Sequence, residues 1–189
     1  DPLGLRLPFI AMLEPYRELV YDNAVVPFIP SIYRDTVVCY SYSKSLSMPG
    51  ERIGYVCIPD TVTDSALLFA AVAGASRACG HVCAPSMMQL VIARAAALRP
   101  DLAAYDQNRS LLYNALTEMG YDCVKPQGAF YMMVKAPNGD SRAFSELAKR
   151  ENLLIVPADT FGCPGFCRVS TCVDPDMIRR AGKSEAKRS

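Results

Sequence analysis

The residues whose types and spacing best suit covalent chemistry lie between positions 41 and 55, where the sequence reads SYSKSLSMPGERIGY. Lys44 follows an apolar, strand-like run, and partial burial there would favour the neutral amine that condenses with an aldehyde to form a Schiff base. The hydroxyls of Ser41 and Ser43 and the guanidinium of Arg52 can donate hydrogen bonds to phosphate oxygens. These side chains together would suit an aldehyde cofactor that carries a phosphate, such as pyridoxal phosphate. The alternative is a serine-rich loop with a solvated lysine.

A second cation that could bind a ligand is Arg168, which lies in the run GFCRVS. Its neighbours are largely apolar, and burying an arginine there without a partner would be costly. A carboxylate ligand would satisfy the guanidinium through paired hydrogen bonds. The alternative is a salt bridge inside the protein.

The elements that must hold these side chains follow from hydrophobic periodicity and from the positions of proline and glycine. We expect strands at residues 9–13, 36–41, 52–58, 121–124, 129–134, 153–156 and 167–172. We expect helices at residues 61–75, 86–97, 102–119 and 141–150, with Thr61 or Thr63 capping the first and Asp101 the third. This order predicts an α/β unit over residues 1–100 and a smaller α+β unit over residues 101–189, entered by a long helix.

Composition excludes several classes of protein. The chain has 189 residues, is 51% hydrophobic and carries a formal net charge of +1, so neither a disordered chain nor a nucleic-acid-binding protein is expected. The longest apolar stretch, residues 66–75, is about half of the roughly 20 residues that a membrane span needs. The mean hydropathy of +0.11 is high for this length, which indicates apolar surface that something else covers.

The eight cysteines do not form a metal-binding pattern. Cys79 and Cys83 flank His81, the single histidine, but no second pair has the spacing of a zinc site. We therefore expect no bound metal, and reduced cysteines in a cytoplasmic protein.

Longer patterns resemble those of one enzyme family. The S-x-S-K run followed by P-G-x-R-I-G-Y resembles the cofactor-lysine signature of class I/II aminotransferases, the aspartate aminotransferase-like enzymes of fold type I. The resemblance runs from residue 14 to about residue 173, and the chain looks like the C-terminal half of such an enzyme. It implies part of the large cofactor-binding domain over residues 1–100 and the small C-terminal domain over residues 101–189.

The resemblance also implies a role for each candidate residue. Lys44 would form the Schiff base with pyridoxal phosphate and shuttle a proton, and Ser41, Ser43 and Arg52 would bind the cofactor phosphate. The segment EPY resembles the family's D-E-P-Y, whose tyrosine hydrogen-bonds the phenolic oxygen of the cofactor, so Tyr16 inherits that role. A tyrosine packed beside a proline loop is the alternative for Tyr16.

The substrate side of the site resembles the family as well. The run GFCRVS is similar to G-x-x-R-[LIV]-S, whose arginine clamps the substrate α-carboxylate, which gives Arg168 that role. The run PQGAFY resembles the family element near the substrate. The partners implied are an amino acid, a 2-oxo acid and a second copy of the chain in a homodimer.

Two features depart from the family pattern. Leu13 stands where the family has an aspartate that keeps the pyridine nitrogen of the cofactor protonated, so the electron sink should be weaker. The chain is also roughly half as long as these enzymes, and their upstream phosphate loop and N-P-x-N-P-T-G segment are not in it.

Three functional hypotheses follow. The leading one is amino-group transfer from an amino acid to a 2-oxo acid through a Lys44 Schiff base, in a fragment or divergent member of reduced competence. The second is a pyridoxal-phosphate-dependent enzyme of another reaction class on the same fold, such as a β-lyase. The third is a non-catalytic aminotransferase-like domain.

Overall fold

The computed structural model describes residues 9–185 and divides the chain into two compact units. The first unit comprises Asp1–Glu18 and Val25–Pro100, and the second comprises Leu19–Ala24 and Asp101–Ser189. The short segment Leu19–Ala24 therefore packs with residues that follow it by more than 75 positions in the chain. The sequence pattern did not predict this grouping.

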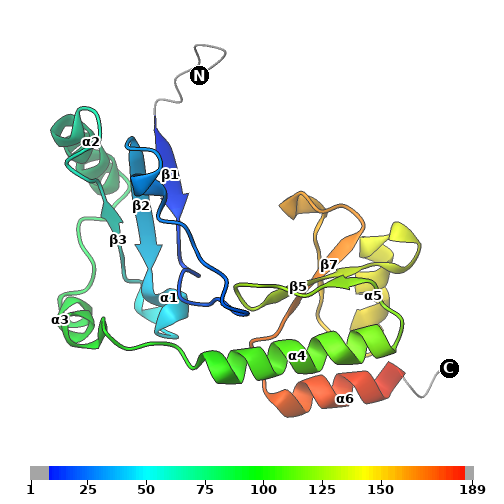
Figure 1. Cartoon of the computed structure of the whole chain (residues 1–189). Helices are drawn as coiled ribbons and strands as arrows, with labels where there is room; N and C mark the ends of the chain where they lie inside the picture. Colours follow the sequence, from blue (N-terminus) through cyan, green and yellow to red (C-terminus); the bar gives the residue numbers. More distant parts are fainter. Residues whose placement is uncertain (1–8, 186–189) are drawn as a thin grey trace. The chain divides into compact units, whose positions relative to one another are not determined.

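The first unit is built on a three-stranded sheet of order β1-β2-β3 (Figure 1). Strand β1 (Ile10–Leu13) runs parallel to β2 (Thr36–Ser41), and β3 (Gly54–Cys57) is antiparallel to β2. The central strand reads TVVCYS and is mostly buried, as expected for β-branched and aromatic residues between two neighbours.

The helices of the first unit follow the sheet in sequence. They are α1 (Tyr42–Ser45), α2 (Ser65–Ala78) and α3 (Ser86–Ala95). Ile53 packs with Met88 and Ile92 of α3 in a small buried cluster. Helix α2 contains no buried residue in the described part of the chain, although its sequence is apolar.

Helix α2 begins later than expected and is not capped by a threonine. Its N-cap residue is Asp64, which has a left-handed backbone and makes no side-chain cap. Thr63 instead donates its amide and hydroxyl to the Asp35 carboxylate, at 2.8 and 3.2 Å. The prediction of a threonine cap was wrong: the helix begins after Asp64, and the Thr63 hydroxyl is turned towards the Asp35 carboxylate, so it does not accept a helix amide.

Gly54 permits a close approach of strands β2 and β3. A Cβ atom at this position would lie 2.2 Å from the Tyr40 carbonyl oxygen, which is backbone and cannot move aside. We expect Gly54→Ala to lower the free energy of unfolding by about 1–3 kcal/mol, measured by urea denaturation.

Gly74 provides the matched control for that substitution. It lies inside α2 with nothing within 4 Å of an added Cβ, so Gly74→Ala should stabilise the chain by about 0.5–1 kcal/mol. Equal effects of the two substitutions would contradict the proposed steric role of Gly54.

The second unit is an antiparallel sheet of order β4-β5-β7-β6 with helices around it. The strands are β4 (Cys123–Val124), β5 (Tyr131–Lys135), β6 (Val156–Pro157) and β7 (Phe166–Ser170). The helices are α4 (Leu102–Glu118), α5 (Ser141–Arg150) and α6 (Pro175–Glu185). Helix α4 packs on α6, and α5 packs on β6 and β7 (Figure 1).

Helices α4 and α6 differ in how well the sequence predicted them. Asp101 accepts a hydrogen bond from the Ala104 amide at 3.0 Å, which confirms the predicted cap of α4. Helix α6 was not predicted, because charged residues interrupt its few apolar ones and its buried apolar contact, Ile178, comes from tertiary packing.

Candidate functional site

The candidate cofactor lysine lies on the short helix that follows the central strand of the first unit. Ser41 ends β2 and is the N-cap of α1, where its hydroxyl accepts the Ser43 amide at 3.3 Å. The two serine hydroxyl oxygens are 2.8 Å apart. Lys44 is half-buried on the next turn, and its Nζ lies 5.9 Å from the centre of the Tyr16 ring. The structure thus brings Lys44, Tyr16 and both serines together.

A hydrogen-bond network that the sequence did not indicate includes Ser45, the residue after Lys44. The buried Tyr40 hydroxyl donates to Glu18 Oε1 at 2.8 Å and is hydrogen-bonded to Ser45 Oγ at 2.7 Å. Burial raises the pKa of Tyr40 to about 12, so the hydroxyl keeps its proton at neutral pH. Tyr40 and Ser45 are close enough in sequence for a bond between them to be considered. The bond to Glu18 could not be predicted, because Glu18 is distant from both in the sequence.

Arg52 lies at the end of the turn that follows α1. It adopts a left-handed backbone, with φ of 52°, and its Nη1 donates to the Pro49 carbonyl at 3.0 Å. The side chain is exposed, so binding an anion there would require little desolvation of the guanidinium.

Leu13 ends strand β1, beside the carboxyl end of β2. It pairs in register with Cys39, and 73% of its surface is exposed. The next residue, Glu14, is buried and forms an ion pair with Arg17 at 2.6 Å. Because successive side chains of a strand point to opposite faces, the Glu14 carboxylate does not take the place of the one missing at residue 13.

Arg168 belongs to the second unit, in the middle of strand β7. Its guanidinium carbon lies 4.4 Å from the centre of the Tyr131 ring and 4.2 Å from that of Phe161. None of the ion pairs in the described part of the chain involves it. The arginine is therefore held by aromatic ring faces, which stabilise a cation without occupying its hydrogen-bond donors.

A buried arginine that was not predicted holds the segment Leu19–Ala24 in the second unit. Arg109 is 1% exposed, and its guanidinium donates to both Asp22 carboxylate oxygens at 2.7 and 2.8 Å. It also bonds to Asp106 and to the Pro126 carbonyl, and it lies 4.5 Å from the Tyr21 ring centre. The guanidinium lowers the pKa of Asp22.

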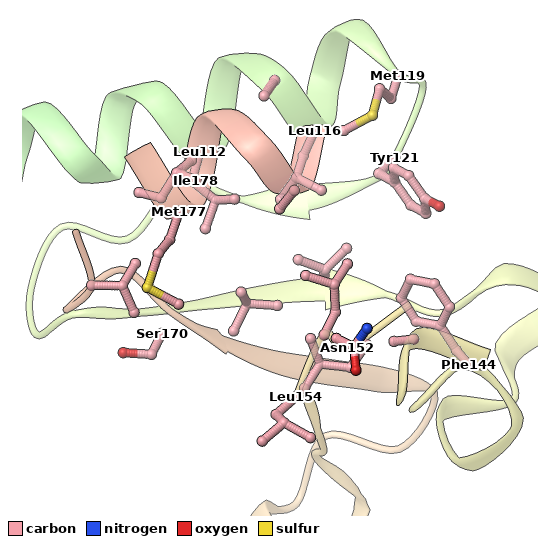
Figure 2. A pocket seen from close by; sticks show the side chains of 18 residues that line it. Leu112, Leu116, Met119, Tyr121, Phe144, Asn152, Leu154, Ser170, Met177 and Ile178 are labelled. Atoms are coloured by element: carbon pink, nitrogen blue, oxygen red, sulfur yellow. The ribbon is translucent and has the colours of Figure 1, made fainter. Parts of the chain in front are cut away.

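An apolar cavity of about 350 Å³ lies in the second unit, between helices α4, α5 and α6 and the sheet (Figure 2). Its lining is mostly aliphatic and aromatic, as the labelled Leu112, Leu116, Phe144 and Ile178 illustrate. Its lining contains no amine, carboxylate or thiol, and its polar side chains are those of Tyr121, Asn152 and Ser170.

Two negative findings concern the described part of the chain. Within residues 9–185, no helix combines the length and the apolar character needed to cross a membrane. The same residues contain no group of three or more His, Cys, Asp or Glu side chains that could hold a metal ion.

Comparison with known proteins assigns the family. The family model for aminotransferase class I and II matches residues 14–184. A solved structure of an amino transferase from Eubacterium rectale is 57% identical, with a TM-score of 0.88 over 95% of this chain and 46% of its own. Aromatic-amino-acid aminotransferase 2 from Thermococcus litoralis and aspartate aminotransferase from Pyrococcus abyssi are each 28% identical over 183 residues, which is 89% of this chain and 45% of theirs.

The chain belongs to the aminotransferase class I and II family. It spans about half the length of the curated relatives it matches. The expected α/β architecture of fold type I, with a partial large domain, is confirmed. Aminotransferases of this family depend on pyridoxal phosphate.

Proposed function

We propose that this chain carries the cofactor lysine of a pyridoxal-phosphate-dependent aminotransferase that moves an amino group between an amino acid and a 2-oxo acid. The observation that carries the proposal is the half-buried Lys44, whose Nζ lies 5.9 Å from the Tyr16 ring centre. A lysine amine is the group that condenses with an aldehyde cofactor to form a Schiff base, and Tyr16 lies beside it.

The donor chemistry around Lys44 fits the cofactor. When bound, pyridoxal phosphate supplies an aldehyde for Schiff-base formation and a ring that withdraws electrons from the substrate carbon. Ser41, Ser43 and Arg52 offer hydroxyl and guanidinium donors for its phosphate, and Tyr16 offers a phenol for its ring oxygen. Lys44 would provide the covalent attachment and then, as a free amine, move the proton from the substrate Cα.

Arg168 would bind the substrate α-carboxylate. Its contacts with the Tyr131 and Phe161 rings restrain the guanidinium, and a restrained guanidinium favours bidentate binding of a carboxylate. A substrate with an α-carboxylate is what an amino acid and a 2-oxo acid have in common.

Leu13 favours a second candidate function, a cofactor-binding domain with little or no turnover. An exposed leucine at the end of β1 provides no carboxylate to hold a proton on the pyridine nitrogen. The proposed enzyme is therefore a divergent member of reduced competence, or a part whose activity requires further polypeptide.

The proposal extends to assembly and location. Leu67 and Phe69 of α2 are 71% and 64% exposed, and apolar surface of this kind supports a homodimer. The eight cysteines are free thiols, which supports a reducing compartment such as the cytoplasm. We also propose that the domain boundary falls near residue 100, in accord with the two units.

A spectroscopic titration tests the proposed function. Adding pyridoxal phosphate to the wild-type chain should produce Schiff-base absorbance that Lys44→Ala abolishes, because among the lysines of residues 9–181 Lys44 is the one on a serine-lined turn. Lys125 provides the matched control, since its Nζ lies 5.7 Å from the Tyr113 ring centre in the second unit. Lys125→Ala should titrate like the wild type; an equal loss in both variants would contradict the proposal.

A further inference from the structure

Tyr40 joins the two chain segments that carry Tyr16 and Lys44. Its hydroxyl donates to Glu18 Oε1 at 2.8 Å and is hydrogen-bonded to Ser45 Oγ at 2.7 Å. Glu18 follows Tyr16 by two residues, and Ser45 directly follows Lys44. One buried hydroxyl thus connects the segment after β1 with the short helix α1.

The position of that hydroxyl is fixed by its surroundings. The Tyr40 ring stacks on Tyr55 with centres 5.1 Å apart and meets the edge of Tyr42 at 5.0 Å. The backbone of Tyr40 pairs in register with Tyr55 across β2 and β3. Because both the ring and the backbone are held, the Tyr40 hydroxyl provides a rigid support for its two partners.

We propose that Tyr40 is a positioning residue that sets Lys44 against Tyr16 through its bonds to Ser45 and Glu18. The inference rests on the proposed function, in which Lys44 and Tyr16 contact the cofactor. Lys44 Nζ and the Tyr16 ring are 5.9 Å apart, and small displacements of either group would weaken cofactor attachment. Tyr40 itself acts through these two neighbours.

The test removes the hydroxyl and keeps the ring. Tyr40→Phe should weaken pyridoxal phosphate binding about five- to tenfold, the effect of losing a buried hydrogen bond, and should shift the pH at which Schiff-base absorbance develops. Tyr55→Phe is the matched control, because it deletes a hydroxyl from the ring stacked on Tyr40 and should leave both values unchanged. A general structural role would lower stability without moving the pH of Schiff-base formation.

Substitutions of Glu18 test the same hydrogen bond from its acceptor side. Glu18→Gln keeps an acceptor for the Tyr40 hydroxyl and should retain most of the affinity. Glu18→Leu removes one of the two bonds of that hydroxyl and should lose part of the affinity that Tyr40→Phe loses. The double variant Tyr40→Phe/Glu18→Leu should be no weaker than Tyr40→Phe, because that substitution already removes the bond to Glu18. Additive losses would contradict a shared bond. Should Tyr40→Phe not fold, Ser45→Ala removes the other half of the network.

Hydrogen exchange without cofactor separates this inference from the proposed function. Tyr40→Phe should accelerate exchange in peptides covering residues 14–18 and 42–46, and Tyr55→Phe should not. If the wild-type chain fails to attach the cofactor at Lys44 but this exchange pattern is found, the proposed function fails and the positioning by Tyr40 stands. If wild type attaches the cofactor and Tyr40→Phe matches Tyr55→Phe in exchange and affinity, the positioning role is overturned and the function stands.

Discussion

Arg109→Met is expected to lower the free energy of unfolding of the second unit by about 2 kcal/mol, because it removes a buried guanidinium that forms several charge-assisted hydrogen bonds. Arg109 is almost fully buried and bonds to Asp22, to Asp106 and to the Pro126 carbonyl. Methionine fills much of the same volume but leaves all three acceptors without this donor. Urea denaturation followed by circular dichroism measures the change.

Arg179→Met is the matched control for this substitution. Arg179 pairs with Asp176 at 2.6 Å with the same i,i+3 spacing as Arg109 and Asp106, but its side chain is 50% exposed. Exposed pairs contribute about 0–1 kcal/mol, so the control should stay close to wild type. Similar losses in the two variants would show that burial is not the decisive difference.

Lowering the pH should reduce the difference in the free energy of unfolding between the wild type and Arg109→Met. The guanidinium holds the pKa of Asp22 below its ordinary value of 3.8. A carboxyl with a lowered pKa stabilises the fold above that ordinary value, and the contribution is lost as the pH falls through the lowered pKa. The variant should therefore lose less stability on acidification than the wild type does.

Leu13→Asp is expected to raise single-turnover amino-group transfer on the order of 100-fold, the effect of one charge placed to stabilise a transition state. An aspartate at the end of β1 would hold a proton on the pyridine nitrogen of the bound cofactor. The measurement uses the chain joined to the part of the Eubacterium rectale protein that it does not span, because the chain by itself is expected to have no appreciable turnover.

Leu13→Asn is the control for charge. It has nearly the shape of aspartate but no negative charge, so it should leave transfer near the level of the leucine protein. The absorbance of the bound cofactor gives a second measurement, since it should change for the aspartate variant alone. Equal rates in the Asn and Asp variants would contradict the charge argument.

Much of the local structure could be predicted because local signals and burial agree. The sequence predicts a strand over residues 36–41, and the structure has β2 at Thr36–Ser41. The prediction succeeds because β-branched residues suit a buried central strand. Residues 141–150 likewise form α5 (Ser141–Arg150). The excursion Leu19–Ala24 could not be predicted, because its partners Arg109 and Gly128 are distant in sequence.

The candidate site was predictable where one continuous motif carries it. The run SYSK places Lys44 and both serines on one turn, and the resemblance added Tyr16. The sequence did not indicate the hydrogen bond from Tyr40 to Glu18, because this bond depends on how β2 packs against the segment after β1. Supporting contacts of this kind follow from tertiary structure alone.

Borohydride reduction with pyridoxal phosphate, followed by peptide mapping, tests the central claim most directly. The experiment is made with the chain alone and with the chain joined to the part of the Eubacterium rectale protein that it does not span. The account predicts that the reduced label lies on the peptide containing Lys44. A label on another lysine, or none when the missing part is supplied, would contradict it.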